Sequence, residues 1–387
     1  ERLDDVPPAV DGFEGAFRYL AGRVEGPFVV ALDEFSYLVE EDEGIPSVFQ
    51  RVVDDVLAET EISLVLLGSS ISMMEEGVLS YESPLYGRRT GQWRLEPMSV
   101  GDASGFFPNY DPIALIRTYS AVGGIPAYLE QFDPDVDLLC NVEQHVLSKG
   151  AFLYEEPEFL LRQELREPAT YMAILEAIAN GATRVTEIAG EIDRDASSLS
   201  RYLDNLTRLA LVERETPVTD PDGRGVYQMT DQFLRFWFRY VSPNRSQLEQ
   251  GHVKPVSESI IATFPEHVSY TFEDVCRQAV RTPAFPVACS RVGRWWYDGQ
   301  EIDIAGLSAE TETLLLGECK WTSDPVGTGL LDDLEALEPE VRWHGSERSV
   351  VYALFSKCGF TDSLEATAAE RDNLVLFTPG DVLELFG

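Results

Sequence analysis

Lysine, histidine and cysteine are scarce in this chain of 387 residues, and long apolar runs are missing altogether. The chain has four lysines and four scattered histidines, so a histidine-rich metal site is not expected. The five cysteines form no CxxC pair, and an odd, unpatterned set is typical of reduced thiols in a cytoplasmic protein. No apolar run reaches the roughly 18–20 residues of a membrane span, and residues 1–5 lack the features of a signal peptide. We therefore expect a globular, cytoplasmic protein with no membrane partner.

Basic charge is also in short supply. The 67 acidic residues outnumber the 30 basic ones, which gives a formal net charge of −37. At ordinary ionic strength such a charge disfavours contact with nucleic acid. Acid enrichment with few lysines resembles the composition of proteins from salt-loving archaea, where multimolar salt reduces the Debye length to about 3 Å or less. The net charge therefore neither requires nor excludes nucleic acid as a partner.

A phosphate-binding loop is the third absence. No G-x-x-x-x-G-K-[ST] motif occurs, and the first lysine is Lys149. Such a loop gives backbone N–H groups and a lysine to the phosphates of a nucleotide. The chain also does not begin with methionine. We expect either a fragment of a longer protein or a domain that has lost its nucleotide pocket.

Two short apolar runs in the N-terminal region each end in polar residues. Phe28–Leu32 leads into Asp33 and Glu34, and the second run covers 62–68 and ends in two serines. Amphipathic helices are expected before the runs, at 9–24 and 46–60. This order predicts a parallel α/β sheet whose strands are buried on both faces. Because ligands bind beyond the carboxyl ends of such strands, Asp33 is a candidate for holding Mg²⁺ and Glu34 for orienting the attacking water. The alternative is a buried strand that merely ends in an acidic loop.

These runs, together with the segment 86–89, resemble the archaeal ATPases of the AAA+ class. The resemblance implies that Asp33 and Glu34 are the Walker B acids, with Asp33 at the metal and Glu34 catalytic. It also implies that Ser69, or Ser70, is the sensor-1 residue that contacts the γ-phosphate or the attacking water. In this family the phosphate-binding loop lies before the region to which this chain corresponds. ATP is therefore an expected cofactor only if that loop is supplied.

Two adjacent arginines, Arg88 and Arg89, occupy the place where this family has the arginine finger of a neighbouring subunit. An arginine there neutralises charge that develops on the phosphates, and its origin in a second subunit implies a homo-oligomer. The alternative is that these arginines pair with acids of their own chain. Residues 95–99 and 106–108 continue the same family pattern.

Residues 106–164 are expected to be mainly helical and to form the lid of the ATPase. The stretch 121–129 contains Gly123, Gly124 and Pro126, which suit a tight turn between helices. This stretch resembles the lid-domain turn of the same ATPases. The alternative is a plain helix connection that makes no contact with nucleotide.

Residues 165–230 are predicted to form three helices and a β-hairpin. The helices are expected at 171–179, at 186–192 and from 195 or 197 to about 209, and the tip of the hairpin at 220–223. This order resembles a winged helix-turn-helix domain, whose third helix enters the major groove of DNA. Candidate contacts to phosphates and base edges lie on the third helix and on the wing: Ser198, Arg201, Asn205, Arg208 and Arg224. Nearby acids, and the many winged helices that bind only proteins, leave a protein partner as the alternative.

Residues 231–255 join this region to the last one. The segment 231–240 holds five aromatic residues and two arginines. It suits either a stacking platform for bases or, as we prefer, an apolar helix packed between domains. Residues 243–255 are expected to be a linker.

The C-terminal region, 256–387, holds a second group of acids. A helix is expected at about 258–281, followed by strands at 291–297, 301–306 and 313–319, with a hairpin turn at 298–299. Asp303 lies near the middle of the second strand and Glu318 near the end of the third. Glu318 and Lys320 are two residues apart, so both leave the same face of the sheet. Two carboxylates can hold Mg²⁺, and a lysine beside them can stabilise charge on a phosphate or position water.

The motifs EIDI and GECK around these residues resemble the PD-(D/E)xK nuclease fold. More closely, they are similar to the DUF234-type, nuclease-like domain that follows archaeal AAA+ cores. The resemblance implies that Asp303, Glu318 and Lys320 are catalytic, that Asp303 and Glu318 hold the metal, and that Glu273 is the upstream helical acid. The later elements expected also fit this fold: helix 327–337, strand 349–355, helix 362–370 and strand 373–377. The alternative is a nuclease-like fold without activity.

The sequence thus predicts an α/β multidomain protein. The expected domains are a partial AAA+ core (1–105), a helical lid (106–164), a winged helix-turn-helix (165–230), an aromatic helix and linker (231–255) and a restriction-endonuclease-like domain (256–387). The expected function is Mg²⁺-dependent cleavage of DNA at the C-terminal acids, gated by an ATPase module. The alternative is a catalytically inactive regulator that binds DNA or a protein.

Overall fold

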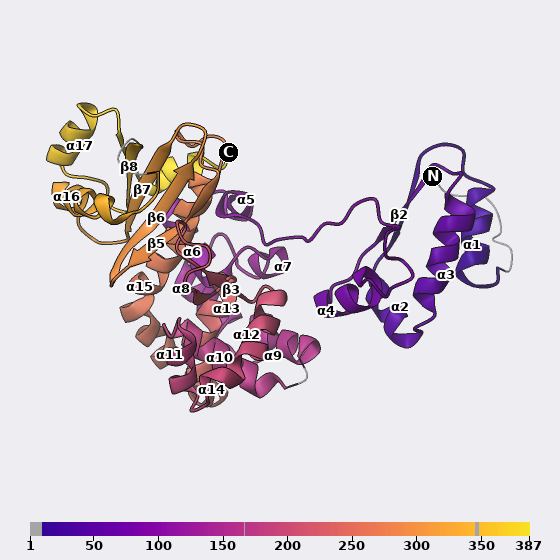
Figure 1. Cartoon of the computed structure of the whole chain (residues 1–387). Coiled ribbons are helices and arrows are strands. Elements are labelled where there is room, and N and C mark those ends of the chain that lie inside the picture. The colour runs from indigo at the N-terminus through magenta and orange to yellow at the C-terminus, as the bar shows by residue number, and fades with distance from the viewer. Residues whose placement is uncertain (1–9, 166, 345–347) are drawn as a thin grey trace. The chain divides into compact units, whose positions relative to one another are not determined.

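The computed structural model describes residues 10–165, 167–344 and 348–387. The chain forms two compact units, of which unit 1 ends at Leu95 and unit 2 covers Glu96–Gly387 (Figure 1). Both units combine helices with β-sheet, as the α/β prediction requires. Within these described ranges, no helix combines the length and the apolar character needed to cross a bilayer.

Unit 1 contains a two-stranded parallel sheet with helices packed on it. Strands β1 (Phe28–Leu32) and β2 (Ile62–Leu66) pair in parallel. The helical elements are α1 (Gly12–Ala21), α2 (Phe35–Glu41), α3 (Ile45–Arg51), the π-helical turn η1 (Val52–Leu57), α4 (Ile71–Met73) and the π-helical turn η2 (Met74–Leu79). The expected order of helix and strand is confirmed, and α2 is a helix that hydrophobic periodicity did not predict.

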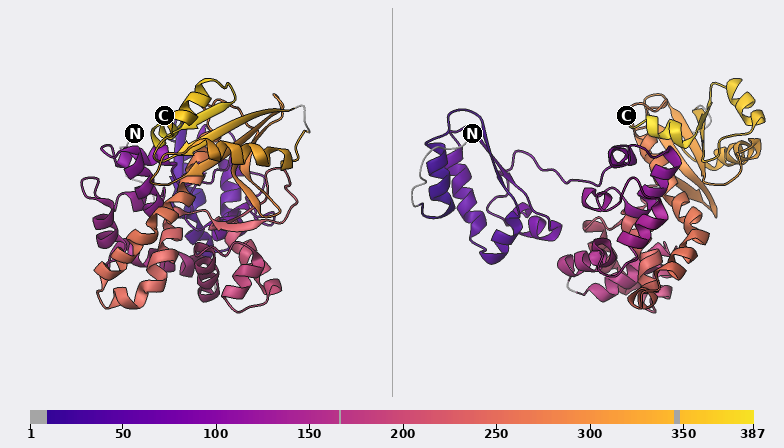
Figure 2. Two further views of the ribbon diagram at one scale, coloured as in Figure 1. Left: turned by 90° about the vertical axis from the view of Figure 1, so that its left-hand side faces the viewer. Right: turned by 180° about the vertical axis from the view of Figure 1, so that it is seen from behind.

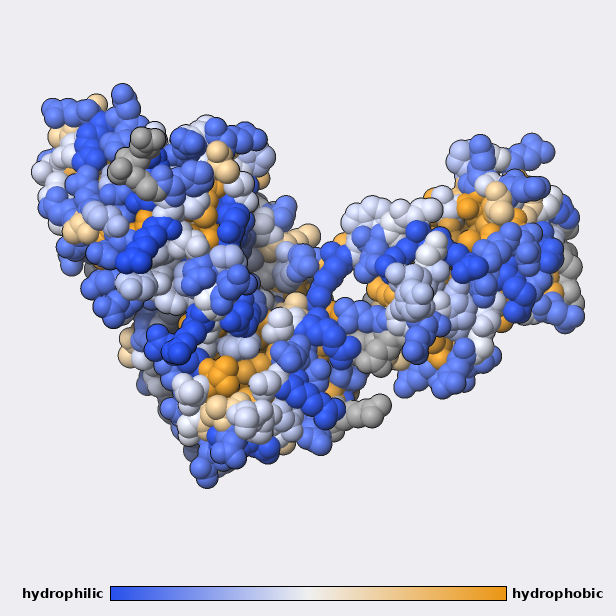
Figure 3. Space-filling view, in the orientation of Figure 1, coloured by the Kyte–Doolittle hydropathy of each residue, from blue (hydrophilic) through white to orange (hydrophobic). Residues whose placement is uncertain are grey.

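The strands of unit 1 are not buried on both faces, so that prediction is wrong. Alternate residues of β1 and β2 face a core that includes Phe35 and Phe49. The residues between them face solvent, with Val29 64% and Val65 41% exposed. Successive strand residues point to opposite faces, and among the described residues the core of unit 1 forms on one face only. Figure 3 shows that apolar patches interrupt a mostly hydrophilic surface.

The first part of unit 2 is helical, as expected. Its elements are α5 (Val100–Ala103), η3 (Ser104–Phe106), α6 (Pro112–Val122), α7 (Pro126–Leu129), α8 (Leu138–His145) and α9 (Phe152–Glu164). Between α6 and α7, Gly123 has a φ of +69°, and a Cβ on Gly124 would lie 2.0 Å from the carbonyl oxygen of Met98. Backbone conformation and close packing therefore account for both glycines of this turn.

Three helices and an antiparallel hairpin follow, in the predicted order. They are α10 (Pro168–Ala179), α11 (Val185–Glu191), α12 (Ala196–Arg208), β3 (Val212–Glu215) and β4 (Val226–Met229). The loop between the two strands packs on the C-terminal sheet. The N–H of Val218 donates to the carbonyl of Arg294 at 2.9 Å, and the Val218 side chain joins the core of that sheet.

The aromatic segment lies in α13 (Gln232–Phe236) and the π-helical turn η4 (Trp237–Val241), and its large rings are buried. Buried rings fit the packed helix that we preferred and rule out a stacking platform for bases. Residues 243–255 are not a linker. They hold most of η5 (Ser242–Asn244), all of α14 (Arg245–Glu249) and the start of α15 (Val253–Val280). The prolines that suggested a linker stand in the first turns of helices, where the missing N–H costs little.

The C-terminal part of unit 2 contains a five-stranded sheet. Its strands, in spatial order, are β5 (Arg291–Tyr297), β6 (Gln300–Ser308), β7 (Thr313–Lys320), β8 (Ser349–Ser356) and β9 (Leu374–Phe377). The pairs β5–β6 and β6–β7 are antiparallel, and β7–β8 and β8–β9 are parallel. The helical elements around it are α16 (Thr328–Leu337), η6 (Glu338–Glu340), α17 (Asp362–Ala369) and α18 (Pro379–Glu384). Helix α15 packs on β6 and β7, and Figure 2 shows the sheet (orange) from two further sides.

His267 of α15 is a buried histidine of unit 2. Its Nε2 lies 2.8 Å from the carbonyl oxygen of Ser120, and its ring stacks on Phe264. Burial lowers its pKa from the ordinary 6.5 to about 3, because the charged ring would lose its water. The folded protein therefore keeps this ring neutral over most of the pH range in which a free histidine titrates.

Acidification is expected to destabilise unit 2 through His267. The unfolded chain binds the proton more readily, so the contribution is complete above pH 6.5 and is lost as the pH falls towards 3. The loss amounts to up to about 1.4 kcal/mol per pH unit. Urea unfolding of the wild type and of His267→Phe, compared over this range, measures it as a difference in slope. Two parallel pH profiles would contradict the prediction.

Candidate active site

In unit 1, the carboxyl ends of β1 and β2 bring Glu34 and Ser69 together across 35 residues of sequence. The hydroxyl of Ser69 donates to Oε2 of Glu34 at 2.9 Å. Glu34 adopts the left-handed conformation, with a φ of +53°, and its N–H donates to Oδ1 of Asp33 at 3.0 Å. Asp33 itself is exposed. The residues predicted as Walker B acids and sensor 1 thus share one edge of the sheet, and their roles stay predictions.

The other residues predicted to act on nucleotide are engaged within unit 1. Ser70 is buried, and its hydroxyl caps α4. Arg88 pairs with Asp54, with 2.8 Å between Nε and Oδ1. Arg89 lies over the ring of Tyr86, at 5.8 Å from its centroid. Arg88 therefore follows the alternative of pairing with an acid of its own chain, and it would have to leave Asp54 to act on a neighbouring subunit.

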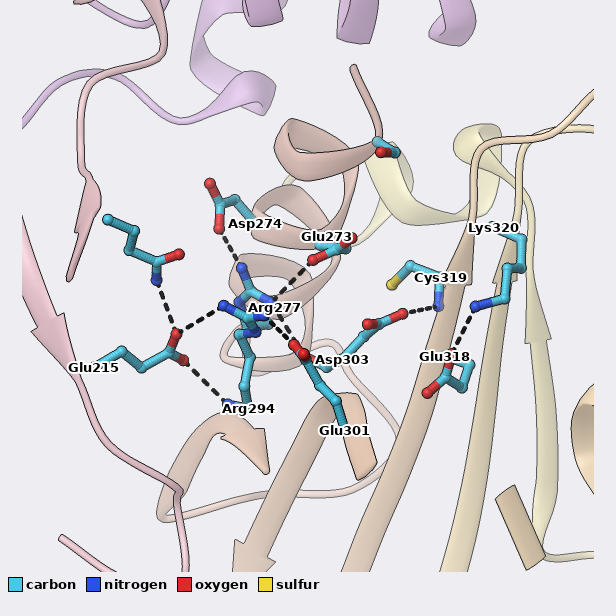
Figure 4. Close-up of polar contacts among 12 residues, drawn as sticks. Glu215, Glu273, Asp274, Arg277, Arg294, Glu301, Asp303, Glu318, Cys319 and Lys320 are labelled. Carbon is cyan, nitrogen blue, oxygen red and sulfur yellow. Dashed lines mark hydrogen bonds and ion pairs between the residues drawn. The ribbon is translucent and has the colours of Figure 1, made fainter. Parts of the chain in front are cut away.

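In unit 2, the strands β6 and β7 place Asp303, Glu318 and Lys320 side by side (Figure 4). Asp303 lies on β6 and the other two lie on β7. The antiparallel register pairs Ile304 with Gly317, and Asp303 and Glu318 are the next residues on each strand. Nζ of Lys320 contacts Oε2 of Glu318 at 2.7 Å. The N–H of Cys319 donates to Oδ2 of Asp303 at 2.9 Å. The three residues predicted from the two motifs are thus brought together.

The acids of this site are short of positive charge. Burial and then the neighbouring Asp303 raise the pKa of Glu318, although Lys320 opposes the rise. Burial and Asp303 also raise the pKa of Glu273, which lies on α15. In both cases the leading cause is the loss of water, which penalises the charged carboxylate. A further cation beside these carboxyls would stabilise negative charge that Lys320 and, beside Glu273, Arg277 offset only in part.

A metal ion in this region would have fewer than three of the described His, Cys, Asp or Glu side chains as ligands. Among the residues that the structure describes, no group of three or more His, Cys, Asp or Glu side chains is arranged to hold a metal. Mg²⁺ is commonly bound through one or two carboxylates, with water and substrate phosphate completing its shell. Asp303 and Glu318 are the pair of carboxylates predicted to meet this requirement, and their role as metal ligands stays a prediction.

Arg277 is a residue of this region that the sequence analysis missed. It is 5% exposed and lies one turn of α15 after Glu273 and Asp274. Its Nη2 pairs with Asp274, and its Nη1 lies 3.9 Å from Oε2 of Glu273. Nη1 also donates to the backbone carbonyl of Asp303 at 3.0 Å, so Arg277 ties α15 to β6 (Figure 4). An arginine three and four positions after two acids is a helical pairing pattern that could have revealed it.

A second arginine joins the hairpin to the sheet. The N–H of Arg294 on β5 donates to Oε1 of Glu215 at 3.1 Å, and its guanidinium pairs with Glu215 and Glu301. Glu215 is the last residue of β3. The hairpin is therefore fixed to the C-terminal sheet beside the candidate site, which the sequence pattern of neither region indicates.

One of the five residues predicted to contact DNA, Asn205, is not exposed. Four of the five are exposed: Ser198, Arg201, Arg208 and Arg224. Asn205 instead donates from Nδ2 to the hydroxyl of Tyr171 at 2.7 Å. This bond joins α12 to α10, so Asn205 has a packing role that competes with contact to a base.

Comparison with known proteins gives two family matches. Residues 9–132 match the model of an ATPase domain predominantly from Archaea. Residues 237–336 match DUF234, which is described as Archaea bacterial proteins of unknown function. The two matches occur in the order that the resemblance implied.

Individual proteins and one solved structure are also similar to this chain. The uncharacterized protein MJECL04 of Methanocaldococcus jannaschii is 37% identical over 320 residues, which cover 81% of this chain and 71% of that protein. A second uncharacterized protein of the same organism, MJ0424, is 42% identical over 60 residues, 15% of this chain and 58% of that protein. The solved Walker-type ATPase PABY2304 of Pyrococcus abyssi is 22% identical, covers 58% of this chain and 66% of its own, and has a TM-score of 0.41.

The similarity to the first of these relatives extends over most of both chains. The ATPase match covers most of unit 1 and the start of unit 2, and the DUF234 match lies in the later part of unit 2. The resemblance to archaeal ATPases followed by a DUF234-type domain is thereby confirmed. The chain belongs to a family of archaeal proteins in which an ATPase domain precedes a DUF234 domain.

Proposed function

We propose that this protein cleaves phosphodiester bonds of DNA with the help of a divalent cation, and that an ATPase module controls this activity. One observation supports the proposal best: Asp303 and Glu318 are neighbours on two strands, with Nζ of Lys320 at 2.7 Å from Glu318. Two carboxylates and a lysine on one sheet face are the groups that metal-assisted phosphodiester hydrolysis requires.

Each side chain has a separate task in this proposal. When bound by Asp303 and Glu318, Mg²⁺ would supply Lewis-acid stabilisation of charge on the scissile phosphate. Lys320 holds a fixed positive charge beside Glu318, where it can stabilise the phosphate or orient water. Glu273, with its raised pKa, can hold a proton on its carboxyl close to Asp303. Arg277 holds the Asp303 carbonyl and with it the position of β6.

Unit 1 would supply control by nucleotide. The contact of 2.9 Å between Ser69 and Glu34 supports a pairing of a catalytic acid with a sensor, and Asp33 is exposed beside them. Binding of ATP also requires a phosphate-binding loop, and these 387 residues contain no such motif. A winged helix made of α10, α11, α12 and the hairpin would contact DNA through the exposed Arg201, Arg208 and Arg224.

Nicking of supercoiled plasmid by the full chain tests the proposal. We expect nicking in Mg²⁺ or Mn²⁺ at high salt, and none in EDTA. Replacement of Lys320 by methionine removes the charge that contacts Glu318, so nicking should fall about a hundredfold while metal binding persists. Equal nicking by the wild type and Lys320→Met, or no nicking under any of these conditions, would sink the proposal.

A second candidate function is a regulator that binds DNA or a protein without cleaving DNA. One observation favours it: within the described part of the chain, no three metal-ligating side chains converge. Binding of DNA without nicking in either Mg²⁺ or Mn²⁺ would support this candidate over the first.

A further inference from the structure

A cavity of about 640 Å³ lies between the hairpin, α15 and the start of β5. The hairpin side contributes residues of 213–218, α15 contributes residues of 274–281, and β5 contributes residues of 290–293. None of the residues predicted to act in catalysis or DNA binding lines it. Ligand sites are frequent where two modules of a chain meet, so the cavity is a candidate site of its own.

The cavity reverses the charge balance of the chain. Its lining holds four arginines and three acids, whereas the whole sequence has 30 basic and 67 acidic residues. The arginines are Arg214, Arg277, Arg281 and Arg291. A local excess of guanidinium groups in so acidic a chain indicates an anionic ligand.

The three acids of the lining are either paired with an arginine or weakened in their negative charge. Asp274 pairs with Arg277. Glu215 pairs with Arg294, which lies outside the lining. Burial, followed by the neighbouring Asp274 and Glu215, raises the pKa of Glu213, which weakens its negative charge. These acids therefore offset the positive charge of the four arginines only in part.

Arg281 and Arg291 are placed to meet an anion. Nη2 of Arg281 donates to the backbone carbonyl of Val292 at 2.9 Å, which orients the guanidinium without neutralising it. Burial and then the nearby Arg277 lower the pKa of Arg281, and the three lining acids oppose this fall only in part, so an anion there would be stabilising. Arg291 is exposed, and no ion pair joins it to an acid of the described chain. A guanidinium presents paired N–H groups that match two oxygens of a phosphate.

The cavity also shares a wall with the candidate active site. Arg277 lines the cavity, and its Nη1 donates to the carbonyl of Asp303 at 3.0 Å. Figure 4 shows Arg277 between Glu215 of the hairpin and Asp303 of the sheet. An extended ligand held in the cavity would therefore lie next to the strand that carries a metal-binding carboxylate.

We propose that this cavity binds a backbone phosphate of a nucleic-acid strand through Arg281 and Arg291, and thereby positions the strand for the Asp303–Glu318 pair. The inference rests on the proposed nuclease function and adds the place where the substrate is held. It assigns substrate contact to the junction of the hairpin with the C-terminal sheet, separate from the third helix of the winged region.

The test is binding of a short fluorescent single-stranded oligodeoxynucleotide to the full chain, followed by anisotropy in EDTA. Arg281→Gln and Arg291→Gln should each weaken binding about tenfold. Each should also reduce the slope of log affinity against log salt by about 0.7, the value for one phosphate contact on a single strand. Arg281→Lys keeps the charge and should retain most of the slope. Inorganic phosphate should compete no better than its ionic strength explains.

Arg162→Gln is the matched control, because Arg162 is an arginine on α9 whose side chain is 66% exposed and lies outside the cavity. It should leave affinity and slope unchanged. The inference is overturned by wild-type values in both cavity variants, by the absence of binding to the wild type, or by specific displacement with millimolar inorganic phosphate. Because EDTA removes the metal, the result does not depend on whether Asp303 and Glu318 cleave DNA.

Discussion

Replacement of Asp303 by asparagine is expected to lower cation-dependent nicking of DNA about a thousandfold. Asparagine keeps the shape of the side chain but removes half of the carboxylate pair that would hold the cation. Loss of Lewis-acid stabilisation costs several kcal/mol of activation free energy, and each 1.4 kcal/mol is a factor of ten in rate. The initial rate of plasmid nicking in saturating Mg²⁺ measures the effect.

Asp298→Asn is the control for this variant. Asp298 is an exposed aspartate in the turn between β5 and β6, where its φ is +48°. Asparagine tolerates this left-handed conformation, so the fold should persist and the rate should not change. A wild-type rate for Asp303→Asn, or an equal loss in both variants, would contradict a role of Asp303 at the reacting phosphate.

Replacement of Arg277 by leucine is expected to destabilise unit 2 by about 3–5 kcal/mol. The change removes the guanidinium that pairs with the buried carboxylate of Asp274 and leaves that carboxylate only the longer contact of 3.7 Å with Arg235. Loss of one partner of a buried ion pair is costly. Urea unfolding followed by tryptophan fluorescence measures it. Five of the six tryptophans lie in unit 2, since Trp93 is the one that precedes Glu96.

Two further variants separate the loss of a charge pair from the loss of an arginine. Arg162→Leu breaks an exposed pair with Glu158 and should change stability by no more than about 0.5 kcal/mol. Asp274→Leu combined with Arg277→Leu should recover part of the loss, because one buried charge is removed with its partner. If Arg277→Leu unfolds at the same urea concentration as the wild type, Arg277 does not contribute this stability to unit 2.

The elements that the sequence predicted best are those with strong local signals. The turn at Asp298 and Gly299 has φ values of +48° and +81°, as a two-residue hairpin loop of the Asp-Gly type requires. That turn fixes β5 and β6, and alternation along β7 then puts Glu318 and Lys320 on one face. These two facts do not set the register of β6 against β7. The expectation that Asp303 lies beside Glu318 came from the resemblance of the two motifs to the nuclease fold.

The features that were missed depend on tertiary packing. Nothing in the composition of the hairpin loop indicates that Val218 joins the core of the C-terminal sheet, or that Glu215 accepts from Arg294. The cavity arises from that docking, so it could not be predicted either. The docking also limits the proposed contact of this loop with DNA, since the loop is bonded to β5 at Val218. Exposed Arg224 remains as its candidate contact.

The failed predictions have physical causes too. Proline at 243 and 255 suggested a linker, but proline is as common in the first turn of a helix. An apolar strand suggested burial on both faces, but exposed Val29 and Val65 show that apolar composition alone does not settle which faces are covered. The preference for high salt that the acidic composition indicates stays a prediction.

Binding of Mn²⁺, followed by electron paramagnetic resonance at high KCl, tests the central claim most directly, because salt suppresses loose association with so acidic a surface. The claim is that Asp303 and Glu318 together hold one divalent cation. It predicts that the wild type binds one more Mn²⁺ ion per chain than Asp303→Asn, and that Asp298→Asn binds as the wild type does. Superimposable titrations of the wild type and Asp303→Asn would contradict it.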